Sequence, residues 1–157
     1  MDKEKKSAFS FRISKSNRTE LIVIMYDMLE VYLEDAVTCR KEENRDGFKE
    51  QLRAADKVLA ELQSILDFTY EISADLYRLY TYCRTALRRS MYRFDTSGIE
   101  EARAVLKSLG AAFRELAKQD NSAPLMKNTE NISYGMTYGR SDILETVSSD
   151  NSRGFFA

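Results

Sequence analysis

The stretch ELIVIMYDMLEVYL (residues 20–33) decides the fold, because it has the length of a helix and few polar residues. At about 100° between neighbouring residues, the side chains of Glu20, Asp27, Glu30 and Glu34 fall within a stripe roughly 80° wide. The apolar side chains cover roughly 200°, whereas a helix that faces a single core needs little more than about 100°. The sequence therefore predicts a helix whose apolar surface must be covered on more than one side.

Helix breakers are scarce in this chain of 157 residues, which has a single proline, Pro124. The first helix is expected to run to about Glu43, and three more helices are expected after it. The segments expected to separate them are NRDG (44–47), DFTYEIS (67–73) and FDTSGIEE (94–101). Ser97 and Glu100, three residues apart, predict a capping box at the start of the last helix.

Apolar residues at helical spacing predict one buried seam in each of these three helices. In chain order the seams are Phe48, Leu52, Ala55, Leu59, Leu62 and Leu66; Leu76, Leu79, Tyr80, Cys83, Ala86, Leu87 and Met91; and Ile99, Ala102, Leu106, Leu109, Phe113 and Leu116. Short connections place sequential helices side by side, so the fold predicted for residues 17–118 is an all-α, antiparallel up-down four-helix bundle. Residues 1–16 are expected to be a flexible N-terminal segment.

Residues 119–157 hold half of the glycines and the only proline, which predicts an irregular C-terminal extension. Apolar residues recur in it more often than in a purely solvating tail. They are Leu125, Met126, Ile132, Tyr134, Met136, Tyr138, Ile143, Leu144, Val147, Phe155 and Phe156. We interpret the extension as an adhesive strap with one helical turn around residues 142–147. It either fills an empty groove on the bundle until a partner displaces it, or clasps a second copy of the chain.

The charges nearly balance, with 24 Lys and Arg against 25 Asp and Glu. This balance gives no electrostatic reason to expect nucleic acid or an anionic membrane as the main partner. No apolar stretch of signal-peptide length follows the charged N-terminus, and the run LIVIM is too short to span a bilayer. We therefore expect a cytoplasmic protein with no membrane insertion.

The chain has no histidine, which removes the commonest general base and the usual zinc ligand. A carboxylate metal site would need acidic residues at inward positions, but the predicted seams are apolar. We therefore expect no enzyme activity, no metal site and no cofactor.

The third predicted helix interleaves arginines with tyrosines in YRLYTYCRTALRRSMYR (77–93). This composition is typical of a protein-binding face, because tyrosine and arginine are enriched at interfaces. An ordinary solvated helix and a surface for single-stranded nucleic acid are the alternatives. The arginines spread over most of the outer arc of the helix and nearby acidic residues offset them, which disfavours nucleic acid.

Two interpretations remain for the excess apolar surface of residues 20–33. The helix either lies centrally among the other helices and the strap, or it forms a groove with the edges of the next two helices. Such a groove would take the amphipathic helix of a partner protein.

Three motifs in order resemble the FliS family, the flagellar secretion chaperones that bind flagellin. Glu20, Leu21, Met25, Tyr26 and Asp27 match a family pattern like E-L-x-x-M-L-Y-D, apart from a slip of one aliphatic position. The segment LDF (66–68) is similar to a family motif at the end of the second helix, and LYRLYTYCRTAL (76–87) is similar to a family motif in the third helix. The resemblance covers about residues 17–118.

This resemblance implies an antiparallel helical bundle that holds the sticky C-terminal helices of unpolymerised flagellin in the cytoplasm. Delivery to the flagellar export gate would follow. The sequence departs from the family at Met28, where the family usually has glycine, and before residue 17, where Phe9, Phe11 and Ile13 stand in for a tyrosine.

The client-binding residues expected on this basis are Met25, Tyr26, Leu29, Tyr77 and Tyr80, in a chain that is a monomer or a homodimer. A homo-oligomeric structural bundle, or a protein-binding adaptor without a flagellin client, is the alternative function.

Overall fold

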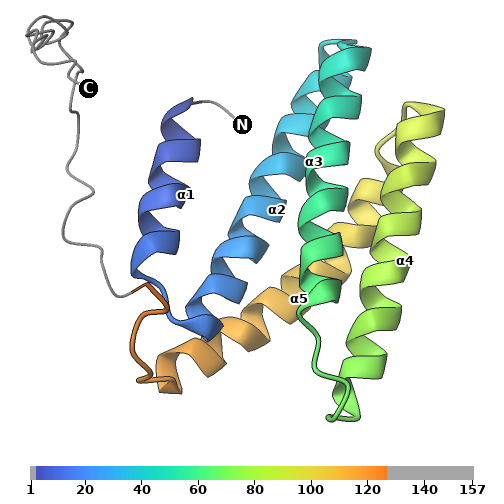
Figure 1. Ribbon diagram of the computed structural model, residues 1–157. Helices are drawn as coiled ribbons and strands as arrows, with labels where there is room; N and C mark the ends of the chain where they lie inside the picture. The colour runs from blue at the N-terminus through green and yellow to red at the C-terminus, as the bar shows by residue number, and fades with distance from the viewer. Residues whose placement is uncertain (1–2, 127–157) are drawn as a thin grey trace, which may run out of the picture.

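The computed structural model describes residues 3–126, and this part of the chain is all-α, as predicted (Figure 1). It has five helices where the sequence predicted four. In chain order they are α1 (Lys3–Lys15), α2 (Arg18–Lys41), α3 (Arg45–Ser64), α4 (Ile72–Arg93) and α5 (Ser97–Gln119). The additional helix, α1, lies within the segment 1–16 that was expected to be flexible. Most of the predicted strap, including the helical turn at residues 142–147, lies outside the described residues.

The connections 42–44 and 65–71 are short, so α2, α3 and α4 stand side by side and alternate in direction (Figure 1). Helix α5 crosses behind them obliquely, from the end of α4 to the beginning of α2, and α1 lies along α2 on the side away from α3. Helix α2 therefore has three helical neighbours, α1, α3 and α5.

The starts of α2 and α5 are capped in different ways. Helix α2 begins with a capping box, in which the Asn17 side chain accepts the Glu20 N–H (2.8 Å) and the Glu20 carboxylate accepts the Asn17 N–H (2.9 Å). The capping box predicted from Ser97 is wrong. Ser97 is the first residue of α5, and its N–H and hydroxyl both donate to the Asp95 carboxylate two residues earlier (3.2 and 2.8 Å).

The end of α4 is fixed by an aromatic residue in the left-handed region, because Phe94 has φ 58°. Its ring packs edge-on against Phe48 (5.1 Å between centroids) and lies under the guanidinium groups of Arg40 and Arg45. Arg40 Nε also donates to the Phe94 carbonyl (2.7 Å). These contacts offset the cost of a left-handed conformation at a residue with a Cβ.

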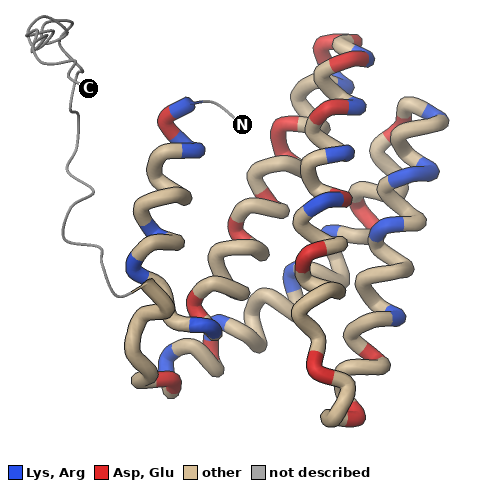
Figure 2. The backbone as a smooth tube through the Cα atoms, viewed as in Figure 1, with Lys and Arg blue, Asp and Glu red and all other residues tan. Residues whose placement is uncertain are grey.

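Charged pairs join α1 to α2, and Figure 2 shows basic positions along α1 and acidic positions along α2. Arg12 pairs with Asp27, Lys5 lies 3.7 Å from Asp35, and Phe9 is the buried apolar anchor. Asp27 also pairs with Arg114 of α5 (2.7 Å), so one carboxylate links three helices. Each exposed pair contributes little on its own, typically below about 1 kcal/mol.

The apolar surface of α2 is covered mainly by its own chain. Among the described residues, no large apolar side chain of α2 is among the exposed ones. The central position that the sequence offered as one interpretation is therefore what the structure shows, with α1 as a cover that was not predicted.

Most residues of the three predicted seams are buried or half-buried, but Leu79 of α4 and Leu116 of α5 are 36% and 53% exposed. Each was predicted to be buried in the seam of its own helix, and this prediction is wrong. Both side chains are exposed because α5 does not follow α4 along its whole length.

Candidate functional site

Helix α5 changes partner along its length. Its N-terminal end packs on α4, where the Gly98 N–H donates to the Ser90 hydroxyl (2.9 Å). Its C-terminal half packs on α2, where the Phe113 ring stacks on Tyr26 (5.6 Å between centroids). The two helices α4 and α5 therefore separate as α5 runs toward its C-terminus.

This separation uncovers a stripe of α4. Residues seven apart on a helix differ by only about 20° in direction, so Ile72 and Leu79 continue the side of α4 on which Ala86 contacts α5. Further along α4 this side is covered by α5, whereas Ile72 and Leu79 are 65% and 36% exposed.

The matching stripe of α5 is uncovered in the same way. Ala102 is fully buried in the core, and Leu109 and Leu116 follow it at intervals of seven. Leu109 is half-buried and Leu116 is exposed. We call the surface formed by Ile72 and Leu79 on α4, and by Leu109 and Leu116 on α5, the α4–α5 wedge.

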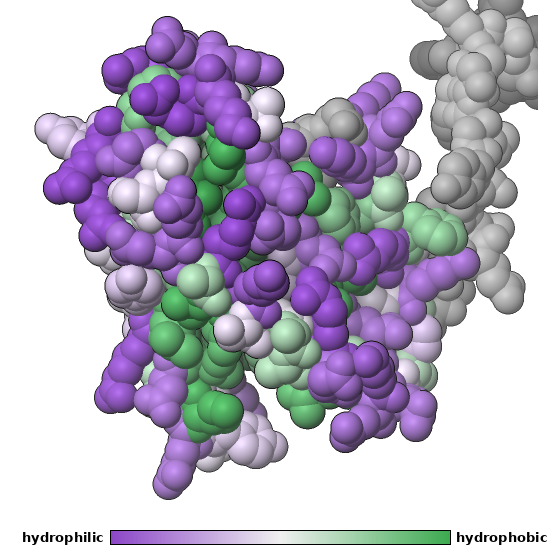
Figure 3. Space-filling view, turned by 180° about the vertical axis from the view of Figure 1, so that it is seen from behind, coloured by the Kyte–Doolittle hydropathy of each residue, from purple (hydrophilic) through white to green (hydrophobic). Residues whose placement is uncertain are grey.

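Figure 3 views the molecule from the α5 side. Hydrophobic side chains gather over the N-terminal half of α4, and again beyond a hollow, over the C-terminal half of α5. Exposed apolar side chains gathered on neighbouring helices are typical of a site of interaction. The α4–α5 wedge is therefore the candidate functional site.

A second group of exposed aromatic residues lies beside the wedge, where α4 begins. Phe68 and Tyr70 in the connection 65–71 are mostly exposed, and the Phe68 ring lies 6.0 Å from the ring of Tyr77. Tyr77 points about 160° away from Leu79 around α4, so this group lies on the opposite flank of the helix.

The structure brings together four of the five residues predicted to bind a client, but it does so in the core. Met25, Tyr26, Leu29 and Tyr80 are all less than a tenth exposed. Only Tyr77, which is 46% exposed, is on the surface. As the structure stands, the four buried residues do not offer a surface to a partner.

Two of these buried residues share a hydrogen bond, since the hydroxyl oxygens of Tyr26 and Tyr80 lie 2.6 Å apart. Burial raises the pKa of both tyrosines above the ordinary value, so both stay protonated. One hydroxyl donates and the other accepts, and the pair satisfies two polar groups inside an apolar core.

This pairing predicts a non-additive pattern of stability. Tyr80→Phe is expected to cost about 1–3 kcal/mol, because it leaves the Tyr26 hydroxyl buried without a partner. The double variant Tyr26→Phe with Tyr80→Phe should be more stable than the sum of the two single losses predicts. Urea unfolding of all four proteins measures this coupling, and strictly additive losses would show that the hydroxyls act independently.

The arginines of α4 are mostly engaged with acidic groups. Arg84 and Arg88 both donate to Asp56 of α3 (2.7 and 3.0 Å), and Arg89 pairs with Glu101 of α5. Burial acts to raise the pKa of Asp56, but the hydrogen bonds and charges of the two arginines outweigh it and hold that pKa below its ordinary value. These pairs fix α4 to its neighbours and offset its positive charge, which disfavours phosphate binding along this helix.

Within residues 3–126, no helix is long and apolar enough to cross a bilayer. The same part of the chain gathers no group of three or more acidic or cysteine side chains that would hold a metal ion.

A family model described as flagellar protein FliS matches residues 2–120. The chain belongs to the FliS family. Membership in the FliS family implies a flagellar chaperone role. The match contains all five helices and ends next to the last residue of α5. A comparison with curated proteins found no match.

The residues that carry the FliS resemblance in α2 have structural tasks in this chain. Glu20 caps α2, Met25 and Tyr26 lie in the core, and Asp27 joins α1 and α5 to α2. The motif therefore specifies how this FliS-family bundle packs, and the exposed apolar surface lies elsewhere.

The sequence did not reveal the wedge of this FliS-family chain. Ile72 fell in a segment read as a break, and Leu79 and Leu116 were assigned to buried seams. Helical spacing showed that these residues lie on apolar faces, but the direction in which α5 crosses α4 decides which parts of those faces are covered.

Proposed function

We propose that this FliS-family chain is a cytoplasmic export chaperone, which binds the C-terminal segment of flagellin, prevents its premature polymerisation and hands it to the flagellar export apparatus. Family membership supports the general role. The observation that carries the proposal is the α4–α5 wedge, where apolar residues at core spacing are left without a neighbouring helix.

An amphipathic helix is the partner that such a surface fits. Such a helix, laid between Leu79 and Leu116, would cover both uncovered stripes with its apolar face and act as a further helix of the bundle. Burial of apolar area provides about 25 cal/mol per Å2 before the cost of ordering the bound segment. A flagellin segment held in this way is masked from other flagellin subunits, which delays polymerisation.

The five residues predicted from the sequence then take two roles. Tyr77 remains a candidate for direct contact, together with Phe68 beside it. Met25, Tyr26, Leu29 and Tyr80 belong to the core that positions α2, α4 and α5, so they support the surface without lining it.

A calorimetric titration with a flagellin C-terminal segment tests the proposal. We expect one segment bound per chain, with an affinity that changes by less than about tenfold between about 0.1 M and about 1 M salt, because apolar burial is screened little. Loss of binding at high salt would mean that charged residues, and not the wedge, form the site. Absence of binding at low salt would contradict the flagellin client itself.

A second copy of the chain is the alternative occupant of the same apolar surface, in a homo-oligomeric bundle or an adaptor without a flagellin client. Light scattering with and without the flagellin segment separates these functions. A chaperone is expected to give a complex of one chain with one segment, whereas a structural oligomer keeps its mass when the segment is added.

A further inference from the structure

The chain beyond α5 is tied to the junction of α1 and α2. The Asn17 side chain, which is buried, donates to the carbonyl groups of Asp120 (3.2 Å) and Ser122 (3.4 Å). The Leu125 N–H donates to the carbonyl of Ser16 (3.0 Å). Although Asn17 and Ser122 are far apart in sequence, these contacts fix the point from which residues 127–157 leave the described structure.

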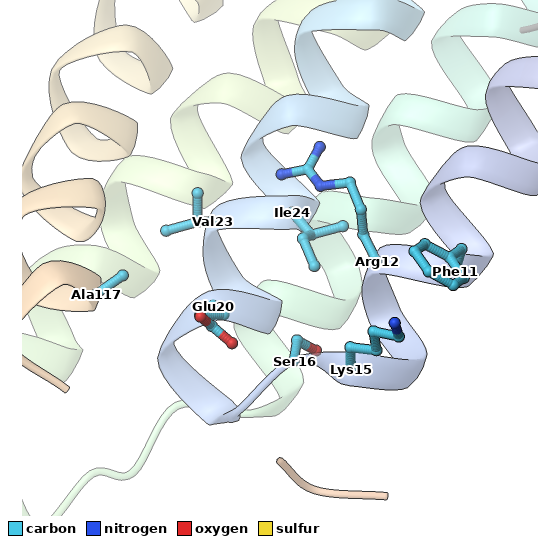
Figure 4. Close-up of a pocket in the computed structure, with 8 residues that line it drawn as sticks. All are labelled: Phe11, Arg12, Lys15, Ser16, Glu20, Val23, Ile24 and Ala117. Atoms are coloured by element: carbon cyan, nitrogen blue, oxygen red, sulfur yellow. The ribbon is translucent and has the colours of Figure 1, made fainter. Parts of the chain in front are cut away.

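A cleft of about 330 Å3 lies at this point (Figure 4). Its lining comes from α1, the junction, α2 and the last turn of α5. The lining residues are Phe11, Arg12, Lys15, Ser16, Glu20, Val23, Ile24 and Ala117. Ser16 both lines the cleft and accepts the hydrogen bond from Leu125, so the chain leaves at the rim. Half of the lining residues are apolar, and the charged ones are Arg12, Lys15 and Glu20.

The sequence that follows has a pattern suited to such a cleft. Ile132, Tyr134, Met136 and Tyr138 alternate with small or polar residues, so an extended segment would place all four on one side. The six residues from Met126 to Ile132 span at most roughly 20 Å when fully extended, which is sufficient to bring this side onto the cleft. Glu130, just before the alternating residues, is acidic, and the cleft has basic residues in its lining.

We propose that residues 130–138 of the same chain dock in the cleft between α1, α2 and the end of α5, with their four alternating apolar side chains facing it. Docking there holds α1 on the bundle. Helix α1 buries only Phe9 and Ser14 among its residues, so a further contact along its cleft side changes how often it detaches. The contact lies within one chain and does not depend on a client.

Amide hydrogen exchange of residues 3–15 in the full chain tests this docking. A variant with serine at positions 132, 134, 136 and 138 is expected to raise the exchange rate of α1 about tenfold. The matched control replaces four apolar residues later in the same tail, Ile143, Leu144, Val147 and Phe155, with serine, and should leave the rate within about twofold. Equal rates in both variants and in the unmodified chain would overturn the proposal.

A substitution on the cleft side keeps the test independent of the tail. Ala117→Arg fills the cleft and is expected to raise α1 exchange as the tail variant does, whereas Ala111→Arg, on an exposed position of the same helix, should not. Protection of α1 that rises with protein concentration would show that the tail docks on a second copy, which also overturns docking within one chain.

Discussion

Replacing Leu79 with glutamate is expected to weaken binding of a flagellin C-terminal segment at least about thirtyfold, or about 2 kcal/mol. The reason is that Leu79 lies at the uncovered stripe of α4, where a carboxylate would have to be buried against the apolar face of the client. The fold should survive, because the side chain is already 36% exposed. Calorimetric titration measures the affinity, and circular dichroism checks the helix content.

The control lies on the same helix at its other end. Tyr92 is 91% exposed and lies outside the α4–α5 wedge, so Tyr92→Glu should leave the affinity unchanged. Leu116→Glu, on the α5 side of the wedge, should weaken binding as Leu79→Glu does. The wedge is not the binding site if Leu79→Glu and Tyr92→Glu have equal effects.

Gly98→Ala is expected to destabilise the bundle by about 1–3 kcal/mol, with a fall in Tm of about 2–4 °C for each kcal/mol. A Cβ at this position would lie 2.1 Å from the carbonyl oxygen of Ala86 and 2.9 Å from the hydroxyl of Ser90. The backbone carbonyl cannot move aside as a flexible side chain does, so α4 and α5 must separate. Thermal and urea unfolding measure the loss.

Gly110→Ala on the same helix is the matched control. The nearest atoms to a Cβ there lie 3.4 Å away, which is ordinary contact distance. Because glycine costs roughly 0.5–1 kcal/mol relative to alanine inside a helix, this substitution should stabilise the protein. A neutral effect of Gly98→Ala would show that the close approach of α4 and α5 is not what fixes the start of α5.

The four long helices and most of their buried faces were predictable, because apolar residues such as Leu52, Leu59 and Leu87 recur at helical spacing and lie in the core. Helix α1 was not predictable in this way. Its sequence has five basic residues and few apolar ones, and contacts distant in sequence, such as Arg12 with Asp27, hold it in place. A tertiary contact of this kind leaves no periodic signal in the segment itself.

The candidate site was the part that the sequence described least well. Tyr26 and Tyr80 were chosen because they sit in motifs with apolar spacing, but the same spacing is typical of core residues, and both are buried. Leu79 and Leu116 are the opposite case, because they have the spacing of core residues but no neighbouring helix covers them. The path of α5, which crosses from α4 to α2, decides which of these apolar residues are buried and which are exposed.

Hydrogen exchange of the full chain with and without a flagellin C-terminal segment is the most direct test of the α4–α5 wedge as the client site. The account predicts that the bound segment slows exchange in residues 72–82 of α4 and 109–116 of α5, with little change at the Tyr92 end of α4. Slower exchange confined to α1 and the adjoining side of α2, with α4 and the end of α5 unchanged, would contradict it.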